Sequence, residues 1–359
     1  MRGRVAVLEA GSQTVSLEEF EVPSPEPGAL VLAMQQAAIC GSDLHVWRGD
    51  TSKMPATPAM MGFGHEGFGT VAALGPGTTT DDAGAPLRIG DRVIHHVIAP
   101  RNPRMQGGVA NRQYGQAPYF ISTFGDYYYV EPNRPVYRVP DALPDDVLAP
   151  VNCAMGAAIN GLLTGKTGFG SNVVLFGAGG LGLTAAAAAK DMGASKVIVL
   201  DRIPARLELA LEFGADHVIN VDETDVDERV ARVFEYTGGR GADVVLELVG
   251  LAGLLPEGIA MTGMGGTYVE VGLFYAGTSV AFDPSTILRG KTIVGSNGYP
   301  AALIPRILDF LVRNLDRRPF ERMASHRFDL ADINDALVQS DWTKGPSTVT
   351  RAVIQIGGR

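Results

Sequence analysis

Two different hydrophobic patterns follow one another along the chain. Up to about residue 155, short apolar runs with strand-like composition are separated by Pro- and Gly-rich segments such as PSPEPG and GPGTTTDDAGAP. These runs cover residues 4–8, 29–38, 69–74, 92–97 and 127–130. From about residue 156, apolar runs such as VVLFGA, KVIVLD and ADVVLELVG alternate with helix-like stretches. Strands that alternate with helices predict βαβ units and a parallel sheet.

The two patterns predict an α/β protein with two domains. A chain of 359 residues is long for a single hydrophobic core. We expect a β-rich domain over residues 1–155, completed by residues 298–359, and a doubly wound parallel-sheet domain over residues 156–297. The closing segment carries two predicted helices, 302–315 and 330–340, and a final strand, RAVIQI.

Composition and charge narrow the function classes. The formal net charge is −9, whereas a nucleic-acid-binding protein needs a basic face, so we expect no nucleic-acid partner. Glu9, Gly11 and Ser12 interrupt the N-terminal apolar positions, which argues against a signal peptide. The most apolar run, 173–189, holds four glycines in its first ten residues, which suits a strand, turn and helix better than a membrane span. These features predict a cytoplasmic protein without a membrane partner.

A glycine-rich turn follows the first strand of the second pattern. The motif G-x-G-x-x-G is formed by Gly177, Gly179 and Gly182, with Gly180 and Leu181 inside it. In dinucleotide-binding folds the first glycine allows the tight turn, the second admits the pyrophosphate and the third permits close helix packing. The N-terminus of the next helix then faces the phosphates.

The dinucleotide-binding motif also expects an acidic residue at the end of the next strand, and this chain has one there. KVIVLD ends in Asp201, 24 positions after Gly177, and the motif expects a ribose-binding acid about 20 residues on. A carboxylate repels a 2′-phosphate, which favours NAD over NADP, although Arg202 works against that preference. Later strands of the same sheet end at Val249-Gly250 and Val271-Gly272, so both pairs are candidates to line the nicotinamide.

Two cysteines and one histidine stand in glycine-rich contexts of the first pattern. They are Cys40, His65 and Cys153, and thiolates and imidazole are preferred zinc ligands. Three protein ligands would leave a fourth position for water or substrate, as in catalytic zinc sites. Their wide spacing does not settle the question, because each is also compatible with an ordinary buried cysteine or a hydrogen-bonded histidine.

Several motifs together resemble those of the zinc-dependent medium-chain dehydrogenase/reductase superfamily. The matching pieces are CGSDLH (40–45), GHEGFGTVAALGPG (64–77), GDRV (90–93), GDYYYV (125–130), NCA (152–154) and GAGGLG (177–182). The resemblance implies a GroES-like catalytic domain and a Rossmann cofactor domain. It also implies zinc ligation by Cys40, His65 and Cys153, with Glu66 as the acid beside the metal, and a proton relay through Ser42 and His45.

We therefore expect a zinc-dependent, NAD-linked alcohol dehydrogenase that interconverts a small alcohol and its ketone or aldehyde. The NCA context is similar to a branch that acts on secondary and cyclic alcohols. Many relatives bind a structural zinc through four cysteines, but residues 94–125 contain none, so we expect one zinc per chain. The family forms dimers or tetramers, which predicts a homo-oligomer through the sheet edge near residues 280–298.

Other interpretations stay open at this level. A relative that reduces C=N or activated C=C bonds, a metal-free quinone reductase and a non-catalytic binding protein all share the fold. Asp43 either orients a zinc ligand or caps a helix. Asp91 and Arg92 are expected to form an ion pair, and His95 and His96 to have surface or packing roles. Trp47 and Phe63 either shape the pocket or pack in the core.

Overall fold

The computed structural model describes residues 1–9, 12–49, 59–60, 63–97, 117–272, 279–344 and 348–357. The chain divides into two compact units. Unit 1 comprises Met1–Cys153, Ala301–Val312 and Phe320–Arg359, and unit 2 comprises Ala154–Pro300 and Arg313–Pro319. Among the described residues, none of the helices combines the length and the apolar character that crossing a membrane requires.

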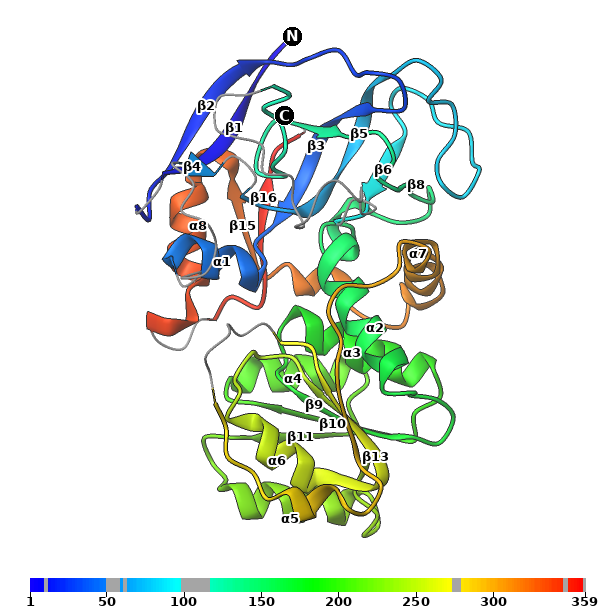
Figure 1. The fold of residues 1–359 in the computed structure, drawn as a ribbon, viewed down its shortest axis with the longest axis vertical. Coiled ribbons are helices and arrows are strands. Elements are labelled where there is room, and N and C mark those ends of the chain that lie inside the picture. The colour runs from blue at the N-terminus through cyan, green and yellow to red at the C-terminus, as the bar shows by residue number, and fades with distance from the viewer. Residues whose placement is uncertain are drawn as a thin grey trace. The chain divides into compact units, whose positions relative to one another are not determined.

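Unit 1 is built on two β-sheets in the described part of the chain. The smaller has the order β2-β1-β4, from Val15–Glu21, Arg2–Glu9 and Ala59–Met60. The larger has the order β15-β16-β3-β5-β6-β8, with β7 also paired to β3. Its strands are β3 (Leu30–Ala38), β5 (Glu66–Leu74), β6 (Arg92–His95), β7 (Tyr127–Val130), β8 (Val136–Arg138), β15 (His326–Asp329) and β16 (Ala352–Gln355). In Figure 1 the red β16 lies directly beside the blue β3, its antiparallel partner.

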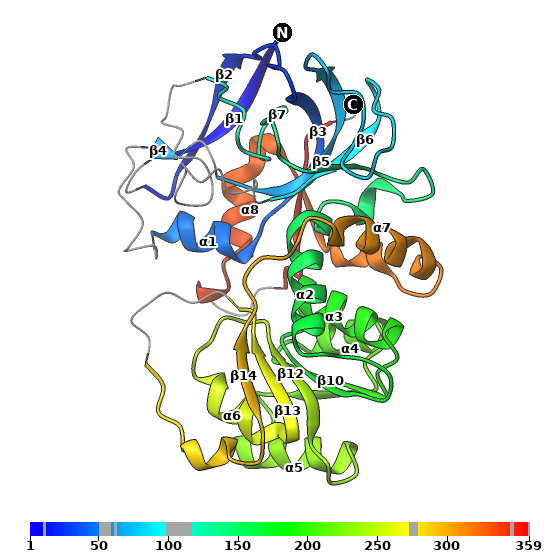
Figure 2. The ribbon, with the colours of Figure 1, turned by 45° about the vertical axis from the view of Figure 1, so that its right-hand side comes forward.

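Two short helices from opposite ends of the sequence share one core in unit 1. Leu44 and Trp47 of helix α1 (Gly41–Arg48) belong to the same buried cluster as Ile333 and Leu337 of α8 (Ile333–Ser340), and the two helices are seen together in Figure 2. The Trp47 indole also donates to the Gln13 carbonyl at 2.6 Å. Both Trp47 and Phe63 belong to this core, so they pack rather than project outward. Helix α7 (Leu303–Asn314) completes the helices of the closing segment.

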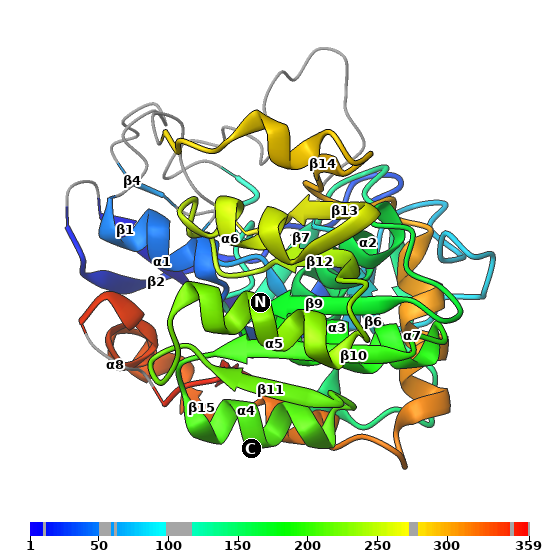
Figure 3. The same cartoon turned by 90° about the horizontal axis from the view of Figure 1, so that it is seen from below.

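Unit 2 contains the parallel sheet that the alternating pattern predicted. Its strand order is β11-β10-β9-β12-β13-β14, which can be followed across Figure 3. The strands are β9 (Asn172–Phe176), β10 (Lys196–Asp201), β11 (His217–Asn220), β12 (Ala242–Glu247), β13 (Thr262–Glu270) and β14 (Thr292–Gly295). The helices are α2 (Gly156–Thr164), α3 (Gly180–Asp191), α4 (Pro204–Glu212), α5 (Val226–Tyr236) and α6 (Leu254–Met261). The order reverses between β9 and β12, and such switch points are where doubly wound sheets bind ligands.

Two sequence expectations in unit 1 need correction or refinement. The predicted Asp91–Arg92 ion pair is wrong, because Arg92 donates to Asp145 at 2.7 Å and Asp91 accepts the Arg88 amide at 2.7 Å. The alternation of apolar and polar residues in a strand does not indicate which residue of another segment a charged side chain contacts. His95 and His96 are both buried, and His95 stacks on the Tyr128 ring at 4.3 Å. Packing, and not exposure, is therefore the role of these histidines.

Candidate active site

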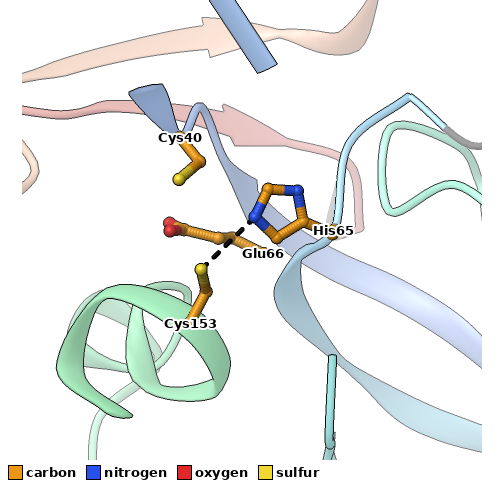
Figure 4. A group of neighbouring side chains, drawn as sticks. All are labelled: Cys40, His65, Glu66 and Cys153. Carbon is orange, nitrogen blue, oxygen red and sulfur yellow. Dashed lines mark hydrogen bonds between the residues drawn. The ribbon is translucent and has the colours of Figure 1, made fainter. Parts of the chain in front are cut away.

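Four metal-binding side chains converge in unit 1. One ligand atom from each of Cys40, His65, Glu66 and Cys153 lies within 4.8 Å of the others. Figure 4 shows the two sulfurs, the imidazole and the carboxylate directed at a common space, with His65 Nε2 3.3 Å from Cys153 Sγ. Among the residues that the structure describes, no other group of three or more histidine, cysteine or acidic side chains brings its ligand atoms this close together. Ligands dispersed over the sequence thus form one site.

Each ligand is positioned by a local backbone feature. Cys40 is the N-cap residue of α1, and Cys153 lies in a π-helical turn, Val151–Met155. His65 follows Gly64, whose φ of +91° is favourable only for glycine and where a Cβ would overlap the Phe124 ring. The backbone that leads into His65 can therefore lie against Phe124 only because residue 64 has no side chain.

The side chain of Asn152 ties two ligand segments together. It is fully buried, its Nδ2 donates to the His65 carbonyl at 3.0 Å and its Oδ1 accepts the Gly67 amide at 3.1 Å. Nδ2 is also 3.3 Å from His95 Nε2. Because Asn152 precedes Cys153, this amide fixes the separation between the Cys153 turn and the His65 strand. Sequence reasoning quoted the NCA motif without assigning its asparagine a role.

Asp43 performs both of the functions that the sequence left as alternatives. Its Oδ2 accepts the Cys40 amide at 2.9 Å, which caps α1, and its Oδ1 lies 3.0 Å from His65 Nδ1. A carboxylate on Nδ1 keeps a hydrogen there and leaves the Nε2 lone pair free for a metal. One buried side chain therefore orients two neighbouring ligands.

The ionisation of the ligands is strongly perturbed by their mutual contacts. The hydrogen bond with Cys153, together with His65, holds the pKa of Cys40 well below its usual range. The same bond and burial raise the pKa of Cys153 well above its usual range. Burial lowers the pKa of His65, but Asp43 and Cys40 outweigh burial and leave that pKa well above its ordinary value. In the absence of a metal, the shifts thus favour one thiolate beside a protonated imidazole, and metal ligation would require that His65 and Cys153 lose their protons.

Glu66 is paired with an arginine that sequence reasoning missed. The Arg351 guanidinium donates to Glu66 Oε2, and both side chains are almost fully buried. Burial raises the pKa of Glu66 to about 8 in spite of this pairing. The second oxygen, Oε1, is buried without a hydrogen-bond partner in the described structure. The sequence separation of 285 positions between the two partners explains why no local pattern revealed the pair.

These residues fit a zinc ion. Two thiolates and an imidazole form the donor set that zinc prefers, and they leave a tetrahedral position open. The contact with Asp43 holds the His65 ring with Nε2 3.3 Å from Cys153 Sγ, and a carboxylate oxygen of Glu66 lies within 4.8 Å of the other ligand atoms. Cys40, His65 and Cys153 would hold the metal, with Glu66 beside it.

The two residues expected to relay a proton lie on α1. Ser42 is in the first turn, two residues after Cys40, and His45 is in the last turn. Both are partly buried. His45 Nδ1 is 3.1 Å from Arg48 Nη2, and its ring meets the edge of Trp342. Helical spacing thus places the two residues one turn apart.

The glycine-rich turn of unit 2 has a defined geometry. Gly177 has a φ of +99°, and its amide donates to the Leu200 carbonyl at 2.7 Å. A Cβ on Gly182 would overlap the Gly177 carbonyl oxygen, whereas a Cβ on Gly179 would meet nothing within 4 Å. Gly182 is therefore needed for packing, and Gly179 faces open space at the N-cap of α3.

Asp201 and its neighbour are both engaged in local contacts. The two oxygens of Asp201 accept the Ala178 amide at 2.6 Å and the Ile203 amide at 2.9 Å. Arg202 forms an exposed ion pair with Asp222 at 2.9 Å. The Asp201 carboxylate is thus anchored beside the glycine-rich turn, and Arg202 is directed toward another acid.

A buried glutamate organises the ends of two further strands. Oε1 of Glu247 accepts the amides of Val249 and Gly250, both at 2.9 Å. Its carbonyl accepts the amides of Val271 at 3.0 Å and Gly272 at 2.9 Å. Both pairs that the sequence singled out are thus fixed by one residue, which sequence reasoning did not identify.

Comparisons with known proteins agree over most of the chain. Residues 26–141 match the family described as the alcohol dehydrogenase GroES-like domain, and residues 180–313 match that of zinc-binding dehydrogenases. The 5-exo-hydroxycamphor dehydrogenase of Pseudomonas putida is 32% identical over 334 residues, covering 89% of this chain and 91% of that protein. An L-threonine 3-dehydrogenase of Pyrococcus abyssi is 32% identical over 288 residues, or 79% of each chain.

Solved structures show the same fold. An alcohol dehydrogenase from Thermotoga maritima superposes with a TM-score of 0.88 at 27% identity, covering 99% of both chains. The benzyl alcohol dehydrogenase of Acinetobacter calcoaceticus gives a TM-score of 0.82 at 26% identity, covering 99% of this chain and all of that one. The expected combination of a GroES-like and a Rossmann-type domain is confirmed.

Proposed function

Because the chain belongs to the zinc-dependent medium-chain alcohol dehydrogenase superfamily and is an oxidoreductase acting on CH–OH groups, we propose that it oxidises a secondary or cyclic alcohol with NAD. The reaction interconverts the alcohol and its ketone or aldehyde at one zinc per chain, held by Cys40, His65 and Cys153. The observation that carries this proposal is the convergence of these three side chains with Glu66 in unit 1.

The protein's own residues supply positioning and proton transfer. Zinc bound to this donor set supplies Lewis-acid stabilisation of the substrate oxygen. Ser42, two residues from ligand Cys40, receives the hydroxyl proton, and His45 passes it to solvent. Glu66 lies beside the ligands and adjusts the charge of the site. Asp43 and Asn152 hold the ligands in place.

The preference for NAD is attributed to unit 2. Gly177, Gly179, Gly180, Leu181 and Gly182 receive the pyrophosphate at the N-terminus of α3. The Asp201 carboxylate, anchored by two amides, faces the ribose hydroxyls. The Arg202 guanidinium is directed toward Asp222, with which it forms an exposed ion pair. Val249, Gly250, Val271 and Gly272 line the nicotinamide.

The substrate class rests on the relatives and on the motif around Cys153. The hydroxycamphor relative acts, by its name, on a hydroxyl of a cyclic compound. We propose a small cyclic or secondary alcohol as substrate of a cytoplasmic homodimer or homotetramer. The proposed contact is β14, an edge strand of the unit 2 sheet, where Ile293 is 40% and nearby Leu288 is 82% exposed.

Metal content and a substrate panel test this function together. Elemental analysis of the purified protein should give about one zinc per chain, and NAD with a cyclic secondary alcohol should raise absorbance at 340 nm. Cys153→Ala should lose zinc and activity together, whereas Met155→Leu, a volume-conserving change in the same buried turn, should lose neither. Reduction of imines or activated alkenes without alcohol oxidation would support the reductase alternative. Zinc binding without turnover of any panel member would indicate a binding protein.

A further inference from the structure

The C-terminal end of α1 carries a charged array that the functions above do not explain. Arg48 Nη2 lies 3.1 Å from His45 Nδ1, while Arg48 Nη1 lies 2.9 Å from Asp341 Oδ1. The Arg48 side chain is 9% exposed and that of Asp341 is 1% exposed. A buried arginine therefore connects the proposed relay histidine to an aspartate 293 residues from Arg48.

The contact with Arg48 determines the tautomer of His45. A guanidinium has only donors, so His45 Nδ1 must be the acceptor. A neutral imidazole has one N–H, which then sits on Nε2. The lone pair of Nδ1 is the only site at which this ring can take up a proton, and the Arg48 N–H occupies it.

The array also contacts the segment that follows α8. Asp341 Oδ1 accepts the Thr343 amide at 3.0 Å and the Thr343 hydroxyl at 2.7 Å. The Trp342 ring lies over the Arg48 guanidinium at 4.9 Å and meets the His45 ring edge-on at 5.9 Å. Among the described side chains in this array, the charged groups facing the imidazole are Arg48, from its own helix, and Asp341, which reaches it through Arg48.

We propose that Arg48, anchored by Asp341, is a positioning residue of the proton relay that controls proton uptake at His45. This inference rests on the proposed role of His45 as the relay's outer member. A proton released from the alcohol hydroxyl bonds to His45 Nδ1 and forms imidazolium after the Arg48 N–H withdraws. Loss of that proton to solvent restores the neutral ring, and Arg48 donates to Nδ1 again.

The tautomer can be observed directly in the zinc-loaded enzyme. Selective ¹⁵N labelling of histidine, with His45→Gln to assign the signal, distinguishes an unprotonated from a protonated Nδ1. At a pH where the ring is neutral, we expect Nδ1 to be unprotonated and Nε2 to carry the hydrogen. A neutral His45 with its hydrogen on Nδ1 would overturn the proposal, whatever the enzyme's activity.

The pH dependence of alcohol oxidation tests the consequence. Removing Arg48 alone leaves Asp341 buried and unpaired, so the informative variant is Arg48→Met/Asp341→Asn, in which the introduced amide oxygen can still accept from Thr343. The variant removes the donor that competes for Nδ1, together with the opposite charges of Arg48 and Asp341, so the acidic limb of the pH–rate profile should move to higher pH. A purely structural role would instead lower the rate equally at every pH.

Two further variants distinguish a failure of the Arg48 proposal from a failure of the proton relay itself. Arg229→Met/Glu257→Gln removes another buried arginine–carboxylate pair, within unit 2, and should leave the acidic limb in place. His45→Gln should abolish the limb assigned to the relay. If His45→Gln abolishes it but the Arg48/Asp341 variant keeps the parental profile, the role of Arg48 is refuted and the relay stands. If His45→Gln leaves the profile unchanged, the relay itself is wrong and this inference fails with it.

Discussion

Asp43 offers a sharp test of how the metal ligands are oriented. In Asp43→Asn, the amide oxygen can still accept the Cys40 amide, as Oδ2 of Asp43 does at 2.9 Å. The amide NH₂ then faces His65 Nδ1, where the carboxylate lies at 3.0 Å. Nδ1 must become an acceptor, so the ring hydrogen moves to Nε2, the nitrogen directed at Cys153. A protonated Nε2 cannot ligate zinc.

The size of the effect follows from the two contacts. Loss of an outer-shell partner of a metal-bound histidine typically lowers metal affinity about 10–100-fold, or roughly 1.4–2.7 kcal/mol. If the amide instead rotates to accept from His65, the cap of α1 is lost at a cost of about 1 kcal/mol in folding stability. We therefore expect a large loss of zinc affinity or a modest loss of stability, because one amide cannot replace both carboxylate oxygens.

Zinc competition with a chromophoric chelator measures the affinity, and urea unfolding of the zinc-free protein measures the stability. Asp81→Asn is the matched control, since Asp81 is also a buried carboxylate that accepts backbone amides, from Ala83 and Ala85. The control should lose some stability and keep its zinc affinity. Parental zinc affinity together with parental stability in Asp43→Asn would refute the dual role of Asp43.

Three other substitutions test separate parts of the structure. Asp201→Ala should raise activity with NADP relative to NAD, measured as the ratio of kcat/KM values; an unchanged ratio contradicts its ribose role. Arg351→Met removes the hydrogen-bond partner of Glu66, whose buried carboxyl already has a pKa of about 8, and should cost about 1–3 kcal/mol in urea unfolding; Glu66→Gln in the same chain should recover part of the loss. Burial and the neighbouring Glu247 raise the pKa of Glu270 to about 8, so its folded form retains a proton that the unfolded chain has released. Stability should fall as pH rises from about 4.5 to about 8, and Glu270→Gln should flatten that fall, as thermal unfolding across pH would show.

The features that the sequence predicted are those encoded locally. The strand before Gly177, the turn itself and the helix after it are contiguous, so their periodicity and glycine spacing carried the prediction. The strands at 127–130 and in RAVIQI were predicted for the same reason, and the structure has them as Tyr127–Val130 and Ala352–Gln355. The short strand Val136–Arg138 was missed, because three residues are too few for a periodic signal.

Most of the site residues missed by the sequence act across long separations. Arg351 pairs with Glu66 and Asp341 with Arg48 through tertiary packing, and an isolated charge in a sequence does not reveal its partner. Glu247 accepts amides only two and three residues away, but a glutamate near the end of a strand carries no motif that indicates this. Asn152 was visible in the motif, but its two hydrogen bonds depend on where the His65 strand lies. The metal ligands were identified through resemblance to a family, since spacings of 25 and 88 residues have no geometric meaning before the chain folds.

The interruption of unit 1 by unit 2 has a consequence for the order of events during translation. The ribosome delivers Cys40, His65 and Cys153 first, then the contiguous stretch of unit 2, and only afterwards β16 and Arg351. Until then residues 36–38 of β3 lack their partner on one edge, and Glu66 has no buried counter-charge. Unit 2 is a continuous segment apart from a short addition and can fold while the nascent chain waits. The metal centre is thus among the last features to be completed, although its ligands are synthesised early.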